Sequence, residues 1–270
     1  MSKLPEAEYR KSNGLCYSDM KELLRSAAHY KWFKDNPTEP TKAMLFGRAV
    51  HMAILTPDES NYVVMDDSDI VAEIGGAKPR ATNAYKAWLG DFEAANKGKD
   101  IISLEDHQAI TAMSNACYAH NAAGALLRAD GLCETSLFWK DEKTKTPMKA
   151  RLDKMLSSGR IIDIKTCEDA RQQAFERSMY NYSYFLQSAV YTEAALRNGY
   201  KLDAPFTFIC VESKPPYGVA VYEIEPASLE LGLMAMRQCI DIFAECTAKN
   251  EWPGYCEEIK QIALPQWAVV

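Results

Sequence analysis

The stretch Lys149–Thr166, KARLDKMLSSGRIIDIKT, decides how the chain folds and what it could do. Two aspartates, Asp153 and Asp163, lie on either side of the short polar segment Ser157–Gly159. Lys165 follows Asp163 by two residues, within a run that is otherwise apolar. Burying charged groups costs free energy unless they are paired or hold a metal ion. The stretch therefore predicts a site at which these charges are compensated.

A three-residue hairpin loop over Ser157–Gly159 predicts how the two flanking strands pair. Such a loop needs a residue in the left-handed conformation, and Gly159 supplies it. In this register Asp153 lies directly opposite Asp163, with Cβ atoms about 4.5–5.5 Å apart. Two carboxylates at that distance repel each other unless a cation lies between them. The alternative is a cross-strand Asp–Lys ion pair on a solvated face, which the apolar composition of the run RIIDIKT disfavours.

A histidine in an apolar helix is the second candidate group. His51 lies in the helix predicted over 42–55, KAMLFGRAVHMAIL, which Thr41 caps and which should be deeply buried. A lone histidine there is usually a core residue with one hydrogen bond. Gly47, one turn earlier, would let backbone approach closely. Imidazole together with two carboxylates is a donor set that suits Mg²⁺ or Mn²⁺.

Further polar residues could serve the same site. Gln187 and Tyr191 are spaced i,i+4 and share one face of a helix, although an ordinary amphipathic helix has the same pattern. Glu134, just before a predicted strand, could add a carboxylate through water. Candidate contacts to DNA phosphates are Arg48, Lys149 and Arg151, and the hairpin strands carry further basic residues, Lys140, Lys143, Lys145, Lys154 and Arg160. A solvated charged ribbon is the alternative for these basic residues.

Periodicity and turn residues predict one α/β domain over 1–270, with a central mixed β-sheet flanked by helices. Helices are expected over 18–34, 42–55, 103–127, 170–197 and 227–248, and strands over 135–140, 148–156, 160–166, 206–212 and 218–225. The first three strands should form a meander. Residues 57–100 are mixed and polar, with an exposed loop at 73–83, EIGGAKPRATN.

Composition sets broad limits on function. The chain has 270 residues, of which 47% are hydrophobic and 25% charged, as in ordinary globular proteins. We find no apolar run long enough for a membrane span and no secretory signal, so no membrane association is expected. The eight cysteines contain no CxxC pair, which favours free thiols in a cytoplasm. The formal charge of −6 gives no global sign of DNA binding, but a local basic surface could provide it.

Taken together and in order, the motifs GRAVH, RLDKM, IIDIKT and QSAVY resemble the PDDEXK nuclease superfamily, in its RecB-like branch. Within that branch, FGRAVHMAILTPDE, FLQSAVY and WPGY resemble the nuclease domain of RecE (exonuclease VIII) and its phage relatives. This similarity extends over roughly 12–264. The chain departs from the family pattern at 149–152, where KARL replaces the usual small residue and glycine.

The resemblance implies a restriction-endonuclease-like (PDDEXK) core and a Mg²⁺-dependent exodeoxyribonuclease. It implies processive 5′-to-3′ digestion of linear double-stranded DNA from its ends, which leaves 3′ single-stranded ends for recombination. It also implies a homotetramer ring, a RecT-type single-strand annealing partner, and a cytoplasmic protein encoded by a bacterium or phage. Many RecB-like relatives carry an iron–sulfur cluster; the wide spacing of Cys16, Cys239, Cys246 and Cys256 leads us to expect none here.

The resemblance also implies roles for single residues. His51, Asp153, Asp163 and the carbonyl of Ile164 would hold Mg²⁺, for which Mn²⁺ could substitute. Lys165 would orient or deprotonate the attacking water. Gln187 and Tyr191 would position the DNA backbone or the strand that carries the lysine.

Two alternatives use the same residues differently. A RecB-like endonuclease or a flap-type repair nuclease would share the chemistry but not the need for a DNA end. A catalytically dead nuclease fold that only binds DNA would commonly have lost part of the site. The presence of His51, Asp153, Asp163 and Lys165 argues against that second alternative.

Overall fold

A five-stranded mixed β-sheet forms the centre of the computed structural model, which describes residues 4–59 and 61–263. Its strand order is β3-β4-β5-β6-β7, and β5 pairs with β6 in parallel while the other neighbours are antiparallel. The strands are β3 (Gly131–Lys140), β4 (Pro147–Leu156), β5 (Ile161–Cys167), β6 (Thr207–Glu212) and β7 (Val219–Glu223). The predicted meander and the predicted mixed sheet are confirmed. Residues 1–3, 60 and 264–270 of the predicted 1–270 domain lie outside the described residues.

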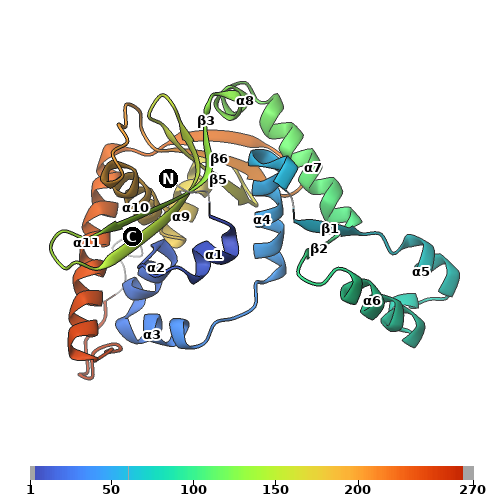
Figure 1. Cartoon of the computed structure of the whole chain (residues 1–270), viewed down its shortest axis with the longest axis horizontal. Helices are drawn as coiled ribbons and strands as arrows, with labels where there is room; N and C mark the ends of the chain where they lie inside the picture. Colours follow the sequence, from blue (N-terminus) through green and yellow to red (C-terminus); the bar gives the residue numbers. More distant parts are fainter. Residues whose placement is uncertain (1–3, 60, 264–270) are drawn as a thin grey trace.

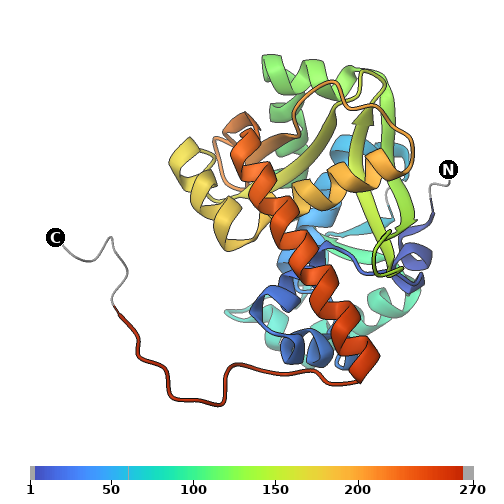
Figure 2. The ribbon, with the colours of Figure 1, turned by 90° about the vertical axis from the view of Figure 1, so that its left-hand side faces the viewer.

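Helices cover both faces of the sheet (Figures 1 and 2). On one face Leu152 of β4 and Phe208 of β6 lie in an apolar cluster with α2 (Tyr17–Arg25), α10 (Tyr184–Arg197) and α11 (Pro226–Lys249). On the other face Ile164 of β5 lies in a second cluster with α4 (Lys42–Leu55), α7 (Leu104–Ala119) and α8 (Asn121–Arg128). The sheet thus separates two apolar cores, which is why β5 alternates between them.

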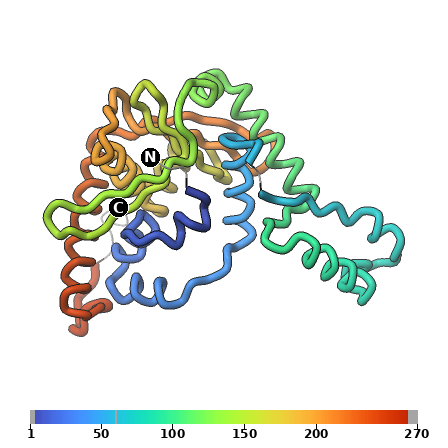
Figure 3. Tube along the Cα trace, in the orientation of Figure 1, coloured from blue at the N-terminus to red at the C-terminus, as the bar shows by residue number. Residues whose placement is uncertain are grey.

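Residues 57–59 and 61–100 form a small lobe that projects from the main body (Figures 1 and 3). It contains η1 (Pro57–Glu59), β1 (Tyr62–Met65), α5 (Ser68–Ile74), η2 (Pro79–Ala81) and α6 (Asn83–Ala95), and β1 pairs in parallel with β2 (Asp100–Ser103). Helices were not predicted here. Thr82 caps α6 by accepting a hydrogen bond from Tyr85 N, and Trp88 stacks on Phe92. Local caps and aromatic contacts therefore order a segment that lacks clear periodicity.

Three predicted helices are each two helices. The break in 18–34 lies at Ser26, which is extended and accepts a hydrogen bond from His29 N to start α3 (Ala27–Asp35). The break in 103–127 lies at His120, whose side chain caps α8, although Ser103 caps α7 as predicted. The third break separates α9 (Gln172–Asn181) from α10. Side-chain caps inside an apolar pattern end one helix and begin the next.

Two further expectations about helices need correction. The N-cap of α2 is Cys16 rather than Ser18, and the Asp19 carboxylate accepts a hydrogen bond from Cys16 N. Helix α4 is capped by Thr41 as predicted, but it is not deeply buried along its length. Only Ala49, Val50 and Ile54 of α4 are fully buried, because only this side of the helix packs into the second apolar core.

The hairpin between β4 and β5 has the predicted register. Lys154 pairs with Ile162 and Met155 with Ile161, so the loop contains three residues, and Gly159 has φ of 83°. The ladder ends after these pairs, and the two strands separate. Beyond this point β4 instead pairs with Leu15, whose N–H donates to the Pro147 carbonyl at 2.8 Å. The segment after α1 (Glu6–Lys11) thus fills the fork between the strands.

Among the described residues, no helix has the length and apolar composition needed to cross a membrane.

Candidate functional site

The candidate site lies where β4 and β5 separate. Asp153 and Asp163 are the first residues beyond the last ladder pair, so they lie opposite each other at the mouth of the fork. Asp153 Oδ2 accepts a hydrogen bond from the backbone N–H of Ile164 at 2.8 Å. The carboxylate thereby replaces a ladder bond that the separating strands no longer make. Because of this bond, the Asp153 side chain is held in place across the fork.

His51 reaches Asp153 from α4. Its Nδ1 atom lies 3.2 Å from Asp153 Oδ2, and its side chain is 25% exposed. Burial alone would lower the pKa of His51, but the Asp153 carboxylate outweighs burial and raises it to about 9. Burial opposes ionisation of Asp153 as well, yet His51 holds the pKa of that carboxyl below its usual range. A positive charge is therefore favoured beside Asp153.

Glu134 joins the same group from β3. In the strand register it lies opposite Asp153, between the pairs Cys133–Lys154 and Thr135–Leu152. Its φ of 53° is left-handed, which is uncommon for a residue with a side chain. Ligand atoms of His51, Glu134 and Asp153 all lie within 4.8 Å of one another. Burial and the nearby Asp153 carboxylate raise the pKa of Glu134. These donors fit a divalent cation, since they combine one imidazole with two crowded carboxylates.

Asp163, Lys165 and Gln187 form the second half of the site. The Lys165 ammonium is in contact with Asp163 Oδ2 and donates to Gln187 Oε1 at 2.8 Å. The Gln187 amide donates to Asp163 Oδ1 at 2.9 Å. Asp163 is fully buried, and burial raises the pKa of its carboxyl to about 6, with Asp153 adding to that effect and Lys165 opposing it. Gln187 thus fixes the lysine-bearing strand.

Tyrosines surround this half of the site. Tyr191 lies beside Gln187 on α10, and burial raises the pKa of its phenol well above the usual range. The ring of Tyr184, at the start of α10, lies under Lys165, with Nζ 4.4 Å from the ring centroid. Tyr9 of α1 lies against the ammonium of Lys149 and the guanidinium of Arg151. Sequence reasoning missed Tyr9 and Tyr184, because only the fold brings them to the site.

The predicted ligands are divided between the two halves. His51 and Asp153 lie together, and Glu134, considered only as an outer group, lies with them. The Asp163 carboxylate points to Lys165 and Gln187 instead. The backbone N–H of Ile164 donates to Asp153 Oδ2 across the fork. Because the N–H and C=O of one strand residue point to the same side, the Ile164 carbonyl also faces the fork. The positive φ of Glu134 is the feature that brings its carboxylate into this group, and the sequence gives little sign of it.

The three residues expected to contact DNA have partners within the chain. Lys149 is buried, and its ammonium donates to the carbonyls of Tyr9, Arg10 and Ser12 at 3.0, 3.2 and 2.7 Å. All three of its hydrogens are used in these bonds, which hold the N-terminal segment against β4.

Arg48 and Arg151 form ion pairs close to the site. Arg48 pairs with Glu6 at 3.2 Å and with Asp100 at 2.7 Å. Arg151 pairs with Glu134 at 2.6 Å, and its buried Nη1 atom has no hydrogen-bond partner among the described residues. Three other basic residues of the hairpin region are also engaged: Lys143 with Asp241, Lys154 with the Leu127 carbonyl, and Arg160 with Glu223. The hairpin strands therefore do not present the continuous basic face expected from the sequence.

The four cysteines considered for a cluster lie in different settings. Cys16 caps α2, and Cys239 and Cys246 are buried in α11. Cys256 is exposed in the segment after α11. Burial raises the pKa of the Cys239 thiol to about 12.

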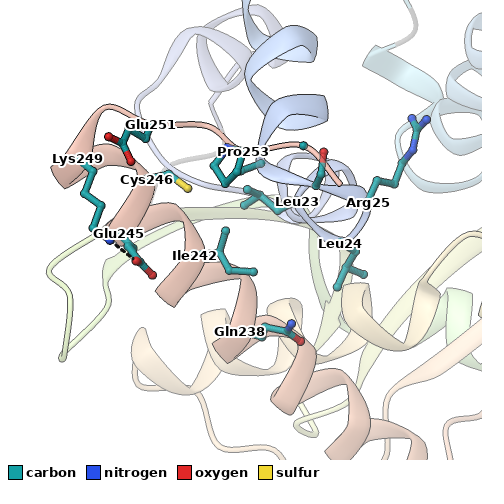
Figure 4. A pocket seen from close by; sticks show the side chains of 13 residues that line it. Leu23, Leu24, Arg25, Gln238, Ile242, Glu245, Cys246, Lys249, Glu251 and Pro253 are labelled. Atoms are coloured by element: carbon teal, nitrogen blue, oxygen red, sulfur yellow. Dashed lines mark hydrogen bonds and ion pairs between the residues drawn. The ribbon is translucent and has the colours of Figure 1, made fainter. Parts of the chain in front are cut away.

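A groove of about 520 Å³ lies elsewhere, between α2, the start of α3 and the end of α11 (Figure 4). Leu23, Ile242 and Pro253 form part of its lining, and an ion pair between Glu245 and Lys249 lies at its edge. None of the residues predicted for the site lines it.

Comparisons with known proteins place these observations in context. Residues 16–265 match the family described as "PDDEXK-like domain of unknown function (DUF3799)". A crystal structure of a "putative exonuclease" from Eubacterium rectale aligns with a TM-score of 0.61 and 13% identity, covering 98% of this chain and 97% of that one. The structure of SSO0001 covers 76% of this chain and 87% of that one, with 14% identity and a TM-score of 0.30. No curated protein sequence matches the chain.

Proposed function

Because the chain belongs to the PDDEXK-like domain family, we propose that it is a metal-dependent exodeoxyribonuclease that acts on the ends of linear double-stranded DNA. One observation carries this proposal: an Asp163–Lys165 pair, held by Gln187, lies next to the group formed by His51, Glu134 and Asp153. That arrangement supplies donors for a cation and an ammonium beside it. Phosphodiester hydrolysis needs both charge stabilisation and an oriented water.

Mg²⁺ would be held by His51, Glu134 and Asp153, and Mn²⁺ could substitute. These residues fit the ion because their ligand atoms converge and because burial, together with the nearby Asp153 carboxylate, raises the pKa of Glu134. When bound, the cation would polarise the scissile phosphate and favour ionisation of a water. Asp163 lies opposite Asp153 across the fork and is the further carboxylate predicted to contact the ion.

Lys165 would orient the attacking water or take its proton. Gln187 and Asp163 hold its ammonium, and the Tyr184 ring covers it, so Nζ has a defined position at the edge of the fork. To accept a proton from the attacking water, the Lys165 ammonium would first have to lose one of its own protons.

Arg151 and Arg48 would contact the DNA backbone once the duplex is bound. The buried Nη1 atom of Arg151 has no hydrogen-bond partner in the described part of the chain, and a phosphate could use it. Both guanidiniums would have to exchange part of a carboxylate pairing for a phosphate. DNA binding should therefore fall steeply as salt concentration rises.

The finer properties follow from the resemblance to RecE-like nucleases. We expect 5′-to-3′ polarity, processive digestion, and 3′ single-stranded ends that a RecT-type annealing protein would use. We also expect a homotetramer ring, because a chain with a net charge of −6 must concentrate its basic groups to hold DNA. A cytoplasmic protein of a bacterium or phage fits the eight free cysteines.

An end-labelled digestion tests this proposal against the alternatives. Linear duplex DNA should be degraded from its ends with Mg²⁺, whereas covalently closed circles should stay intact. Nicking or linearisation of the circles would favour a RecB-like endonuclease, and cleavage confined to branched substrates would favour a flap-type repair nuclease. Binding without cleavage of any substrate would favour a DNA-binding module.

A further inference from the structure

Two exposed tyrosines lie at the junction of α9 and α10. Tyr180 is 77% exposed and Tyr182 is 55% exposed, although tyrosine rings usually bury much of their surface. The junction has a defined conformation. Tyr182 N donates to the Ser178 carbonyl at 2.9 Å, Ser183 has a φ of 59°, and the Tyr17 hydroxyl of α2 donates to the Tyr182 carbonyl. The rings are therefore presented to solvent by a fixed backbone.

A continuous stack of rings connects this junction to the site. The Tyr182 ring stacks on Tyr184, with centroids 5.6 Å apart and an interplanar angle of 27°. Tyr184 in turn lies under the Lys165 ammonium. The Tyr184 ring also stacks on the ring of Phe175, which is buried, so the stack is anchored in the core. Tyr182 is the outermost ring of this series.

We propose that Tyr182, assisted by Tyr180, stacks against an unpaired nucleobase next to the phosphate that reacts beside Lys165. This inference rests on the proposed function and adds how the DNA end is engaged. Aromatic side chains with nearby cationic groups are the usual binding surface for single-stranded nucleic acid. Arg177 is exposed one turn before Tyr180, and no ion pair of Arg177 occurs in the part of the chain that the structure describes.

Stacking at this position would select DNA ends. Inside a duplex both faces of each base are covered by the neighbouring pairs, so an aromatic ring can meet only a terminal or unpaired base. Unstacking a base costs little free energy at a frayed end, whereas an internal base pair must lose its full stacking and pairing free energy. Tyr182 would therefore favour ends over continuous duplex without reading sequence.

Binding of a fluorescently labelled dT12 oligonucleotide, measured by anisotropy in EDTA, tests the proposal without any cleavage. Tyr182→Ala should weaken binding by about 5- to 150-fold, whereas Tyr182→Phe should stay within about twofold of the wild-type chain. Tyr182→Trp should also bind, and the tryptophan emission that it adds should be quenched by dT12. Tyr255→Ala removes another exposed tyrosine, outside the stack, and should bind as the wild type does.

Unchanged dT12 binding by Tyr182→Ala would overturn the proposal. If the molecular mass of this variant in light scattering also fell, the tyrosines would form a contact between copies of the chain instead. Digestion of linear duplex by the wild-type chain is measured in parallel and reports on the proposed function separately. Normal digestion by the wild-type chain, with unchanged dT12 binding by Tyr182→Ala, would contradict the stacking proposal and leave the proposed function standing.

Discussion

Gln187 on α10 holds Lys165 on β5 through a hydrogen bond of 2.8 Å from the ammonium to its amide oxygen. The same amide donates to Asp163, so one side chain fixes the two strand residues of the site. Because α10 packs against the sheet on the face opposite α4, the site is assembled from both apolar cores. Any change that moves α10 should therefore alter the geometry of Lys165.

Lys165→Ala should lower the rate of DNA cleavage by a factor on the order of 10²–10⁴, as expected for a lost acid–base group. Affinity for Mn²⁺ should change little, because the group of His51, Glu134 and Asp153 stays complete. Calorimetry with Mn²⁺ beside a rate assay separates the two effects. Loss of Mn²⁺ binding in this variant would show that the lysine supports the structure of the metal site.

Asp163→Asn should abolish cleavage without lowering the stability of the metal-free protein. Burial and Asp153 raise the pKa of Asp163, which means that its ionised form is unfavourable in the fold. An amide keeps an oxygen that can accept from Gln187, and Lys165 keeps its bond to Gln187. Urea denaturation in EDTA measures the stability. A clear fall in the free energy of unfolding would mean that the ion pair with Lys165 outweighs the cost of burial.

Lys149→Met should loosen the N-terminal segment instead of weakening DNA binding. The Lys149 ammonium is bonded to three carbonyls of residues 9–12, and these bonds hold α1 against β4. Hydrogen exchange of residues 6–12 should become faster, and the free energy of unfolding should fall by about 2 kcal/mol. Lys140→Met changes an exposed lysine of the neighbouring strand and provides the control. Normal hydrogen exchange together with a smaller salt dependence of DNA binding in this variant would show that Lys149 contacts a DNA phosphate after all.

Asp141→Asn should destabilise the protein at neutral pH, by about 1–2 kcal/mol. Asp141 lies in the loop between β3 and β4 and pairs with Arg237 of α11 at 2.5 Å. Burial opposes ionisation, but the bonds to Arg237 and Thr144 outweigh it and lower the pKa from 3.8 to about 2. A lowered pKa stabilises the fold above pH 3.8, and this contribution is lost as the pH falls through 2.

The difference in unfolding free energy between the wild type and Asp141→Asn should therefore be constant above about pH 5 and should shrink between pH 3.8 and 2. Asp169→Asn removes a partly exposed carboxylate whose partner, Arg171, is 85% exposed, and should change stability little. Urea denaturation across this pH range measures both variants. A difference that grows as the pH falls would contradict the assignment.

The sheet and the hairpin register were predictable from sequence for physical reasons. Gly159 can adopt the left-handed conformation that a three-residue loop needs, and this fixes Asp153 opposite Asp163. The apolar alternation of Ile162 and Ile164 then fixes which side of β5 faces the second core. Information of this kind is local, so a single sequence contains it.

The remaining features depend on contacts between distant residues. Ser26 and His120 end helices whose apolar pattern continues beyond them, and an isolated polar residue gives a weak signal. Lys149 reaches carbonyls about 140 positions away, and the partners of Arg151 and Arg48 are likewise set by the fold. For this reason the sequence predicted a basic face where the structure has internal ion pairs.

The most direct test of the central claim is release of labelled nucleotides from linear duplex DNA by the purified chain and by its Asp163→Asn variant, with Mg²⁺ and with EDTA. The wild-type chain should release nucleotides from the ends with Mg²⁺ and release none in EDTA, and the variant should release none in either condition. Equal release by the wild type and the variant, or full release in EDTA, would contradict metal-dependent cleavage at this site.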